Sequence, residues 1–234
     1  MKFILVFLIL VGSVFSQRPI EPWVAQVSIK ERARQLAVAL HNDLWVMYDL
    51  PWCAFYLAWK GGATGGALIE DESSQDPHTN TQFNPSGTQY FKQDFIDQFY
   101  ASTAKEPAIT NYYNGSIYPT NYRAWKVEQG ETKIDAQLKY KGYFVNEQVS
   151  FKLNFSLILP GGQEISITEE PEYVSGGQAG LTRKITISGI PSGYKVLLHI
   201  KGGSSTWSAT GKGALSGDDM IQSEDGVTTL SASW

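Results

Sequence analysis

The fold of this chain is decided by residues 132–159, which read TKIDAQLKYKGYFVNEQVSFKLNFSLIL. Apolar and polar side chains alternate twice in it, once over residues 132–143 and once over residues 148–159. Because successive side chains of a strand point to opposite faces, each run predicts a strand with one buried and one solvated face. The inward positions are Ile134, Ala136, Leu138 and Tyr140 in the first run and Val149, Phe151, Leu153, Phe155 and Leu157 in the second. We expect these strands to be antiparallel neighbours.

The same alternation continues toward the end of the chain. The further strand-like runs are residues 163–169, 181–188, 194–201, 206–209 and 226–234. We expect a Gly-rich loop over residues 171–180, and we expect the Gly and Pro residues of 189–193 to reverse the chain between successive strands. Short strands at regular spacing predict an all-β fold, an antiparallel β-sandwich with few or no helices. Its size also allows a large, mutarotase-like sandwich.

Upstream of residue 132 the pattern is less regular. Residues 28–40 combine helix-forming side chains with a strand-like alternation, and we favour a short turn followed by a strand from about Gln35. Residues 44–49 and 53–60 predict a hairpin. Residues 61–129 are rich in Asp, Ser, Asn, Thr, Pro and Gly, which predicts a long, loop-rich excursion.

The first sixteen residues have the pattern of a secretory signal peptide. Lys2 is followed by an apolar stretch and then by small residues up to Ser16, and the segment is too short for an ordinary membrane span. We therefore expect a secreted protein, extracellular or periplasmic. The remaining residues, 17–234, are expected to form a single β-sandwich domain with a substantial core.

Charge and cysteine content exclude several classes of function. The chain carries 19 Lys and Arg against 23 Asp and Glu and has no basic run, so we expect no nucleic-acid partner. Cys53 is its one cysteine, which excludes an internal disulfide, a thiolate zinc cluster and the CxxCH haem attachment motif. Its apolar neighbours, Trp52 and Ala54, favour a small buried side chain over a reactive thiol.

Aromatic side chains are concentrated near residue 50. Six of them fall within fifteen positions: Trp45, Tyr48, Trp52, Phe55, Tyr56 and Trp59. Aromatic faces can pack on the apolar C–H surfaces of sugars while nearby polar groups form hydrogen bonds, so we consider a carbohydrate site. In a hairpin these rings alternate between two faces, so half or more should lie in the core. The candidate ligand-binding residues are Trp52, Trp59, Lys60, Tyr112, Tyr113 and Trp125.

Catalytic and metal-binding motifs are weak. The acidic segment at residues 70–78 lacks the spacing of a calcium loop, which favours a solvated loop, and we assign no metal or cofactor. No GxSxG elbow or Walker loop occurs in the sequence. We assign no catalytic residue, although Asp71, Glu72 or Glu172 could act as acid and base if the chain were a sugar-active enzyme. The three histidines are far apart, and His199 is expected to be a strand residue with an ordinary partner.

Several short blocks together resemble one bacterial family. They are RPIEPWV at 18–24, ALHNDLWVMYD at 39–49, YLAWKGG at 56–62, YKGYFV at 140–145, EEPEYV at 169–174 and GLTRKITISGIP at 180–191. They resemble the amino-terminal β-domain of secreted or periplasmic multidomain proteins, in which it precedes c-type cytochrome, sugar-dehydrogenase-like or sugar-hydrolase-like modules. The resemblance implies an all-β module associated with extracellular carbohydrate or redox systems. Electron transfer does not carry over, because this chain has no haem attachment motif. Both a stand-alone copy and a shortened multidomain protein remain open.

Three hypotheses follow. The first is a secreted, non-catalytic β-sandwich module that binds carbohydrate or an extracellular protein partner. The second is a sugar-active enzyme of mutarotase-like or hydrolase type. The third is a structural subunit of a surface assembly that associates through the apolar hairpin or through Cys53.

Overall fold

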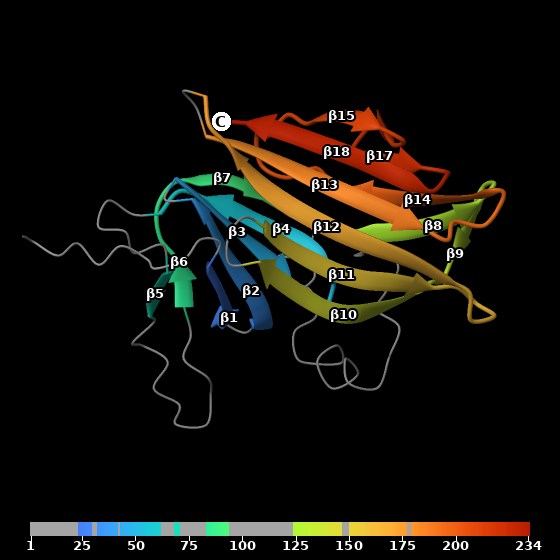
Figure 1. The fold of residues 1–234 in the computed structure, drawn as a ribbon, viewed down its shortest axis with the longest axis horizontal. Coiled ribbons are helices and arrows are strands. Elements are labelled where there is room, and N and C mark those ends of the chain that lie inside the picture. Colours follow the sequence, from blue (N-terminus) through green and yellow to red (C-terminus); the bar gives the residue numbers. More distant parts are fainter. Residues whose placement is uncertain are drawn as a thin grey trace, which may run out of the picture.

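A computed structural model describes residues 23–29, 32–41, 43–61, 68–70, 83–93, 124–146, 150–176 and 179–234. Every regular element in these ranges is a β-strand, and the strands pair antiparallel in three large sheets and one two-stranded sheet. The predicted all-β, antiparallel fold is confirmed. Figure 1 shows the strands stacked in layers, with the end of the chain at the same side of the molecule as β7.

Sheet I is a meander near the start of the chain, in the order β1-β2-β3-β4-β7. Its strands are β1 (Trp23–Ile29), β2 (Arg32–His41), β3 (Leu44–Asp49), β4 (Ala54–Trp59) and β7 (Gln89–Lys92). The hairpin predicted over residues 44–60 is confirmed as β3 and β4. The strand expected from about Gln35 is also present, but it begins at Arg32, where the chain pairs with β1.

Sheet II is the largest, in the order β10-β11-β12-β13-β18-β15. Its strands are β10 (Gln137–Asn146), β11 (Ser150–Ile158), β12 (Glu164–Val174), β13 (Gly180–Ser188), β18 (Gly226–Ser233) and β15 (Ser208–Gly211). Phe151, Leu153, Phe155 and Leu157 are all buried, as the alternation predicts. Ser156, expected on the wet face, is buried too, where its hydroxyl donates to Glu164 Oε1 at 2.7 Å.

The loop expected over residues 171–180 is wrong in its first part. Strand β12 continues through Pro171 to Val174, and Pro171 pairs with Arg183 of β13. The ladder between β11 and β12 ends at Glu169. Because β12 has no β11 neighbour beyond that point, a proline without a backbone N–H is tolerated there.

Sheet III is formed by strands in the order β16-β17-β14-β8-β9. Its strands are β16 (Ala214–Ser216), β17 (Asp219–Gln222), β14 (Tyr194–His199), β8 (Trp125–Gln129) and β9 (Thr132–Ile134). The segment between the strand-like runs 206–209 and 226–234 therefore contains the hairpin of β16 and β17. Two short strands, β5 (Leu68–Glu70) and β6 (Phe83–Pro85), form a separate pair. With β7 and β8, they give four strands in the described part of the expected loop-rich excursion.

Two expected connections differ from the structure. The alternating run over residues 132–143 is not one strand, because β9 pairs in sheet III and β10 in sheet II, with the break at Asp135 and Ala136. The turn at residues 189–193 does not join two paired strands, because β13 lies in sheet II while β14 pairs with β8 and β17. Both segments carry the chain from one sheet to another, and alternation alone does not reveal such a crossing.

Sheet II packs against both smaller sheets. The sandwich therefore has sheet II as one layer and sheets I and III together as the other, which we call the composite layer. The ring of Phe151 lies 5.8 Å from that of Tyr48 in sheet I, and the ring of Phe155 lies 5.2 Å from that of Trp125 in sheet III. Within the composite layer, Trp125 Nε1 donates to the carbonyl of Cys53 at 3.0 Å. The inward side chains of the three sheets form one continuous buried core.

Candidate functional site

The described structure has no exposed aromatic platform at residues 45–59, where the sequence suggested one as a possibility beside core packing. Trp52, Trp59 and Trp125 are 1%, 0% and 1% exposed, so these candidate ligand-binding residues belong to the core. The reason is that every residue of β3 and β4 is buried, so neither face of the hairpin remains open. Tyr112 and Tyr113 lie outside the described residues. Lys60 is the candidate whose side chain is exposed.

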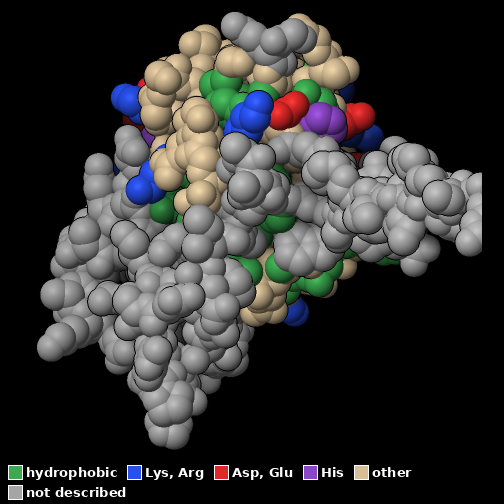
Figure 2. All heavy atoms as spheres, turned by 90° about the vertical axis from the view of Figure 1, so that its left-hand side faces the viewer, with side chains coloured by type: hydrophobic (Ala, Val, Ile, Leu, Met, Phe, Trp, Pro, Cys, Tyr) green, Lys and Arg blue, Asp and Glu red, His purple; other side chains and the backbone are tan. Residues whose placement is uncertain are grey.

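Lys60 belongs to a group of polar and aromatic side chains at one end of the sandwich, which we call the end patch. Its members are His41, Asp43, Lys60, Tyr90, Tyr173 and Trp234. They come from the ends of β2, β4, β12 and β18, from the β2–β3 turn and from β7. Figure 2 views this end of the molecule and shows a basic, an acidic and a histidine side chain beside hydrophobic ones.

An ion pair between Asp43 and Lys60 lies at the centre of the end patch. Lys60 Nζ is 2.9 Å from Asp43 Oδ1, and the two side chains are 50% and 42% exposed. The hydrogen bond from Lys60 lowers the pKa of the Asp43 carboxyl, and the same bond raises the pKa of the Lys60 ammonium. Both groups are therefore ionised near neutral pH and offer charge-assisted hydrogen bonds to a ligand.

The position of Lys60 depends on a close backbone approach. Its backbone N–H donates to the carbonyl of Thr88 at 2.8 Å, which ties the end of β4 to the segment before β7. Gly87 has a φ of 122°, and a Cβ at this residue would lie 2.0 Å from the carbonyl oxygen of Lys60. Only glycine fits here, so this turn sets the place from which the Lys60 side chain projects.

Two aromatic stacks lie near the ion pair, since besides the paired carboxylate one tyrosine from each stack, Tyr90 and Tyr173, raises the pKa of Lys60. The His41 ring is parallel to the Tyr173 ring with 4.0 Å between centroids, and the Tyr90 ring is parallel to the Trp234 indole with 5.2 Å between centroids. The backbone N–H of Asp43 donates to His41 Nδ1 at 3.1 Å, which holds the imidazole in place. His41, Tyr90, Tyr173 and Trp234 are each partly exposed. The end patch thus presents rigid ring surfaces next to ionised groups.

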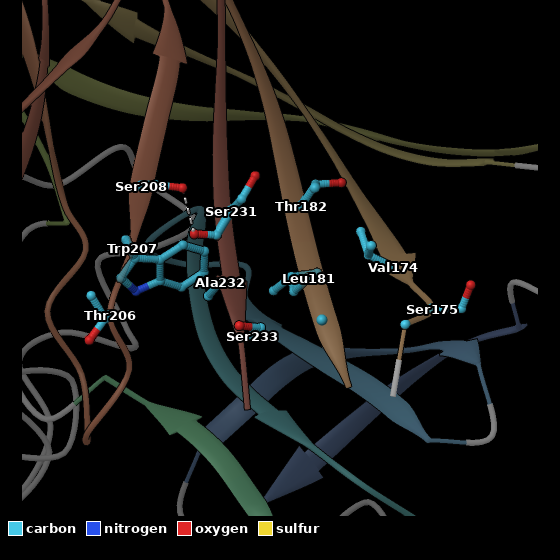
Figure 3. Close-up of a pocket in the computed structure, with 12 residues that line it drawn as sticks. Val174, Ser175, Leu181, Thr182, Thr206, Trp207, Ser208, Ser231, Ala232 and Ser233 are labelled. Atoms are coloured by element: carbon cyan, nitrogen blue, oxygen red, sulfur yellow. Dashed lines mark hydrogen bonds between the residues drawn. The ribbon is translucent and has the colours of Figure 1, made fainter. Parts of the chain in front are cut away.

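A groove of about 850 Å³ lies next to the end patch, over the ends of the sheet II strands β12, β13, β18 and β15. The side chains that line it include six hydroxyls: Ser175, Thr182, Thr206, Ser208, Ser231 and Ser233. Thr182, Ser231 and Ser208 lie side by side on three adjacent strands, as the close-up in Figure 3 shows. No charged side chain lines the groove within the described part of the chain.

Trp207 connects this groove to the core. It is 8% exposed, lines the groove, and stacks edge-on against Phe91 at 5.7 Å. The guanidinium of Arg183 lies 5.6 Å from the centre of its ring. Its indole N–H meets no acceptor among the residues that the structure describes, which is unusual for a buried donor.

Acid–base and metal chemistry have less support. Glu172 is exposed on β12, opposite Thr182, while Asp71 and Glu72 lie outside the described residues. Across the described ranges no three His, Cys, Asp or Glu side chains gather closely enough to hold a metal ion. His199 has the ordinary partner expected of it, since its Nδ1 lies 2.9 Å from Asp219 Oδ1.

Cys53 is buried, as the sequence indicates, and burial raises the pKa of its thiol. Neither this thiol nor the buried β3–β4 hairpin offers the contact surface that the assembly hypothesis requires. Of the described residues, none belongs to a helix long and apolar enough to cross a membrane. The expected signal peptide at residues 1–16 lies outside the described residues.

Sequence reasoning found part of the end patch and missed the rest. Lys60 was a candidate, and Asp43 is close to the aromatic cluster. Nothing local in the sequence singles out Tyr90, Tyr173 or Trp234, because their proximity depends on the pairing of β12 and β18 with β13 and on the packing of sheet I beneath them.

Comparison of the chain with protein-family models, with curated proteins and with solved structures finds no match. The resemblance to amino-terminal domains of secreted bacterial proteins therefore stays a prediction, and the function is argued from the geometry of the end patch.

Proposed function

We propose that this protein is a secreted, non-catalytic β-sandwich module that binds carbohydrate at the end patch. The observation that carries the proposal is the exposed Asp43–Lys60 ion pair close to two aromatic stacks, each made of two parallel rings. A sugar ring has an apolar C–H face and a rim of hydroxyls. Partly exposed aromatic rings pack against the face. The carboxylate accepts hydrogen bonds from the hydroxyls of the rim, and the ammonium donates hydrogen bonds to them.

The chemistry of the patch suits recognition better than turnover. Its single carboxylate, Asp43, is held ionised by Lys60, so it is a poor proton donor near neutral pH. Hydrolysis of a glycosidic bond ordinarily needs a second carboxyl group on the other side of the sugar. In the described ranges, no second carboxylate is among the residues that define the patch. The enzyme hypothesis therefore ranks below binding.

A protein partner is the second candidate, and it is favoured by a different surface. Tyr143 and Phe144 of the edge strand β10 are 46% and 56% exposed. Exposed aromatic side chains at a sheet edge are common contacts in protein interfaces. Lys139 and Lys141 lie on the same strand, and lysines on an edge oppose pairing with another strand. This candidate therefore rests on the two aromatic side chains alone.

One experiment tests the carbohydrate candidate and the position of its site. We expect wild-type protein to bind glycans on an array of soluble and immobilised polysaccharides, and we expect Lys60→Gln to weaken that binding roughly tenfold or more, because a charge-assisted hydrogen bond contributes about 1.5–3 kcal/mol. Tyr173→Ala should weaken it as well, through loss of the stack with His41. Thermal unfolding of each variant shows whether the fold is intact.

Phe144→Ala is the matched control, since it removes an exposed aromatic ring outside the end patch. It should bind glycans like wild type. Loss of binding in Phe144→Ala with full binding in Lys60→Gln would move the site to β10. Absence of glycan binding by the wild-type protein would refute the carbohydrate proposal.

A further inference from the structure

The end patch and the groove are joined through one side chain, Trp234. Its indole stacks on Tyr90 of the patch, and its ring centroid also lies 6.4 Å from that of Trp207 in the groove, with the planes 88° apart. Trp234 Nε1 donates to Ser205 Oγ at 2.6 Å, and its backbone N–H donates to the carbonyl of Ala179 at 2.8 Å. These contacts fix the ring, which touches Tyr90 of the patch and Trp207 of the groove.

The end patch and the groove are also neighbours along the chain at two places. Tyr173 of the patch is followed directly by Val174 and Ser175 of the groove, and Ser233 of the groove directly precedes Trp234. The patch and the groove therefore lie at the same end of β12 and β18.

The groove has the polarity of a site for an uncharged, hydroxyl-rich ligand. Each serine or threonine hydroxyl both donates and accepts, as sugar hydroxyls do. The lining offers no cation to a carboxylate or sulfate within the described residues, and the ammonium of Lys60 on the neighbouring patch is already paired with Asp43. An anionic polymer would lose hydration here without gaining a counter-charge.

The size of the groove also indicates more than one sugar unit. Its volume of about 850 Å³ is near the upper end of the roughly 300–1,000 Å³ that small-molecule sites span. The end patch adds its own ring surfaces to this length. A ligand that fills both is longer than a monosaccharide.

We propose that the ligand is a neutral polysaccharide, and that its chain runs from the end patch over Trp234 into the hydroxyl-lined groove. This inference rests on the proposed carbohydrate-binding function. It adds that the ligand is uncharged, that it is longer than one sugar unit, and that the groove is the second half of the site. Trp234 is then the contact shared by neighbouring sugar units.

Ser231→Tyr tests the inference, because Ser231 lies on the open face of sheet II in the middle of the groove. The probes are neutral and uronic-acid-containing oligosaccharides, from one to six sugar units, on a glycan array. We expect the bound oligosaccharides to be neutral, with affinity that rises with length. The tyrosine side chain should fill the groove and weaken binding of the long oligosaccharides roughly tenfold, while the shortest ones that bind keep their affinity.

Ser188→Tyr is the matched control. Ser188 is exposed at the other end of β13, away from the groove, so this variant should bind all lengths like wild type. Preference for uronic-acid oligosaccharides, equal affinity for one and six units, or wild-type binding by Ser231→Tyr would each overturn the inference. If one of these results is found while Lys60→Gln still weakens binding, the end patch alone remains the proposed site. If no oligosaccharide binds the wild-type protein, the proposed function itself fails.

Discussion

At the scale of single residues, the feature that most constrains the core is a buried ion pair. Arg183 and Glu169 are 1% and 0% exposed, with Arg183 Nε 2.7 Å from Glu169 Oε1 and Nη2 3.1 Å from Oε2. Tyr48 of sheet I donates its hydroxyl to the same Oε1 at 2.8 Å, and burial raises the pKa of that phenol. The guanidinium also lies 4.5 Å from the centre of the Phe55 ring. The pair thus joins both layers of the sandwich.

We expect Arg183→Met to lower the free energy of unfolding by about 3–5 kcal/mol, because it leaves the Glu169 carboxylate buried without its partner. The double variant Arg183→Met/Glu169→Leu should recover at least half of this loss, since no unpaired charge remains. Urea unfolding measures both.

The matched control uses an exposed ion pair. Lys201 and Asp218 are 66% and 52% exposed with 3.0 Å between their charged atoms, so Lys201→Met should change stability by less than about 1 kcal/mol. A double variant no more stable than Arg183→Met would show that the electrostatic explanation is wrong and that packing alone determines the loss.

At the scale of elements, the connection between β13 and β14 decides how the two layers are linked. It leaves sheet II at Ser188 and enters sheet III at Tyr194. Asp225 Oδ1 accepts the backbone N–H of Ile190 at 2.9 Å, and the backbone N–H groups of Gly189 and Ile190 lower the pKa of this carboxyl. The crossing is thereby tied to the segment that precedes β18.

Two glycines of this connection allow a controlled comparison. Gly189 and Gly193 have φ values of 85° and 81°, which disfavour any residue with a Cβ. A Cβ at Gly189 would lie 2.7 Å from the carbonyl oxygen of Glu164, whereas one at Gly193 would meet no described atom within 4 Å. We expect Gly193→Ala to destabilise the protein by about 1–2 kcal/mol, and Gly189→Ala by clearly more.

Urea unfolding of the two variants gives the difference directly. The conformational penalty of a positive φ is common to both, so the difference isolates the close approach of Gly189 to β12. Equal loss in the two variants would mean that β12 and the crossing separate easily.

At the scale of the whole molecule, two sheets of separate sequence origin behave as one layer. Sheet I comes from the first part of the described chain and sheet III mainly from the last. Two hydrogen bonds nevertheless join them, one from Trp125 to the carbonyl of Cys53 and one of 3.0 Å from Gln93 Nε2 to the carbonyl of His199. Sheet II packs over both. The three large sheets are therefore predicted to unfold as a single cooperative unit.

Cys53 provides the probe for this prediction. Burial raises the pKa of its thiol, so in the folded protein it is protonated, enclosed and unreactive. We expect pulse labelling of Cys53 by iodoacetamide and far-UV circular dichroism to report the same urea midpoint, because the thiol reports sheet I and the dichroism reports all sheets. Labelling at clearly lower urea than the loss of dichroism would show that sheet I unfolds on its own.

The strands themselves could be predicted from local pattern. In β11 the inward positions Phe151, Leu153, Phe155 and Leu157 are as expected, because the two-residue period is a property of a single strand and needs no knowledge of its neighbours. The β3–β4 hairpin could also be located from local pattern, although both of its faces are buried. For the candidate site, local pattern indicated Lys60, but it also suggested Trp52, Trp59 and Trp125 as ligand contacts, and these three are buried.

What the sequence determined by itself is the all-β class, most strand positions and the burial of Cys53, since each follows from residues that are neighbours along the chain. Only the tertiary structure decided that β9 and β10 belong to different sheets, that Trp52, Trp59 and Trp125 lie in the core, and that Tyr90 and Tyr173 come close to Lys60. The physical reason is that register and layer packing join residues far apart in sequence, and alternation within one strand is compatible with many such pairings.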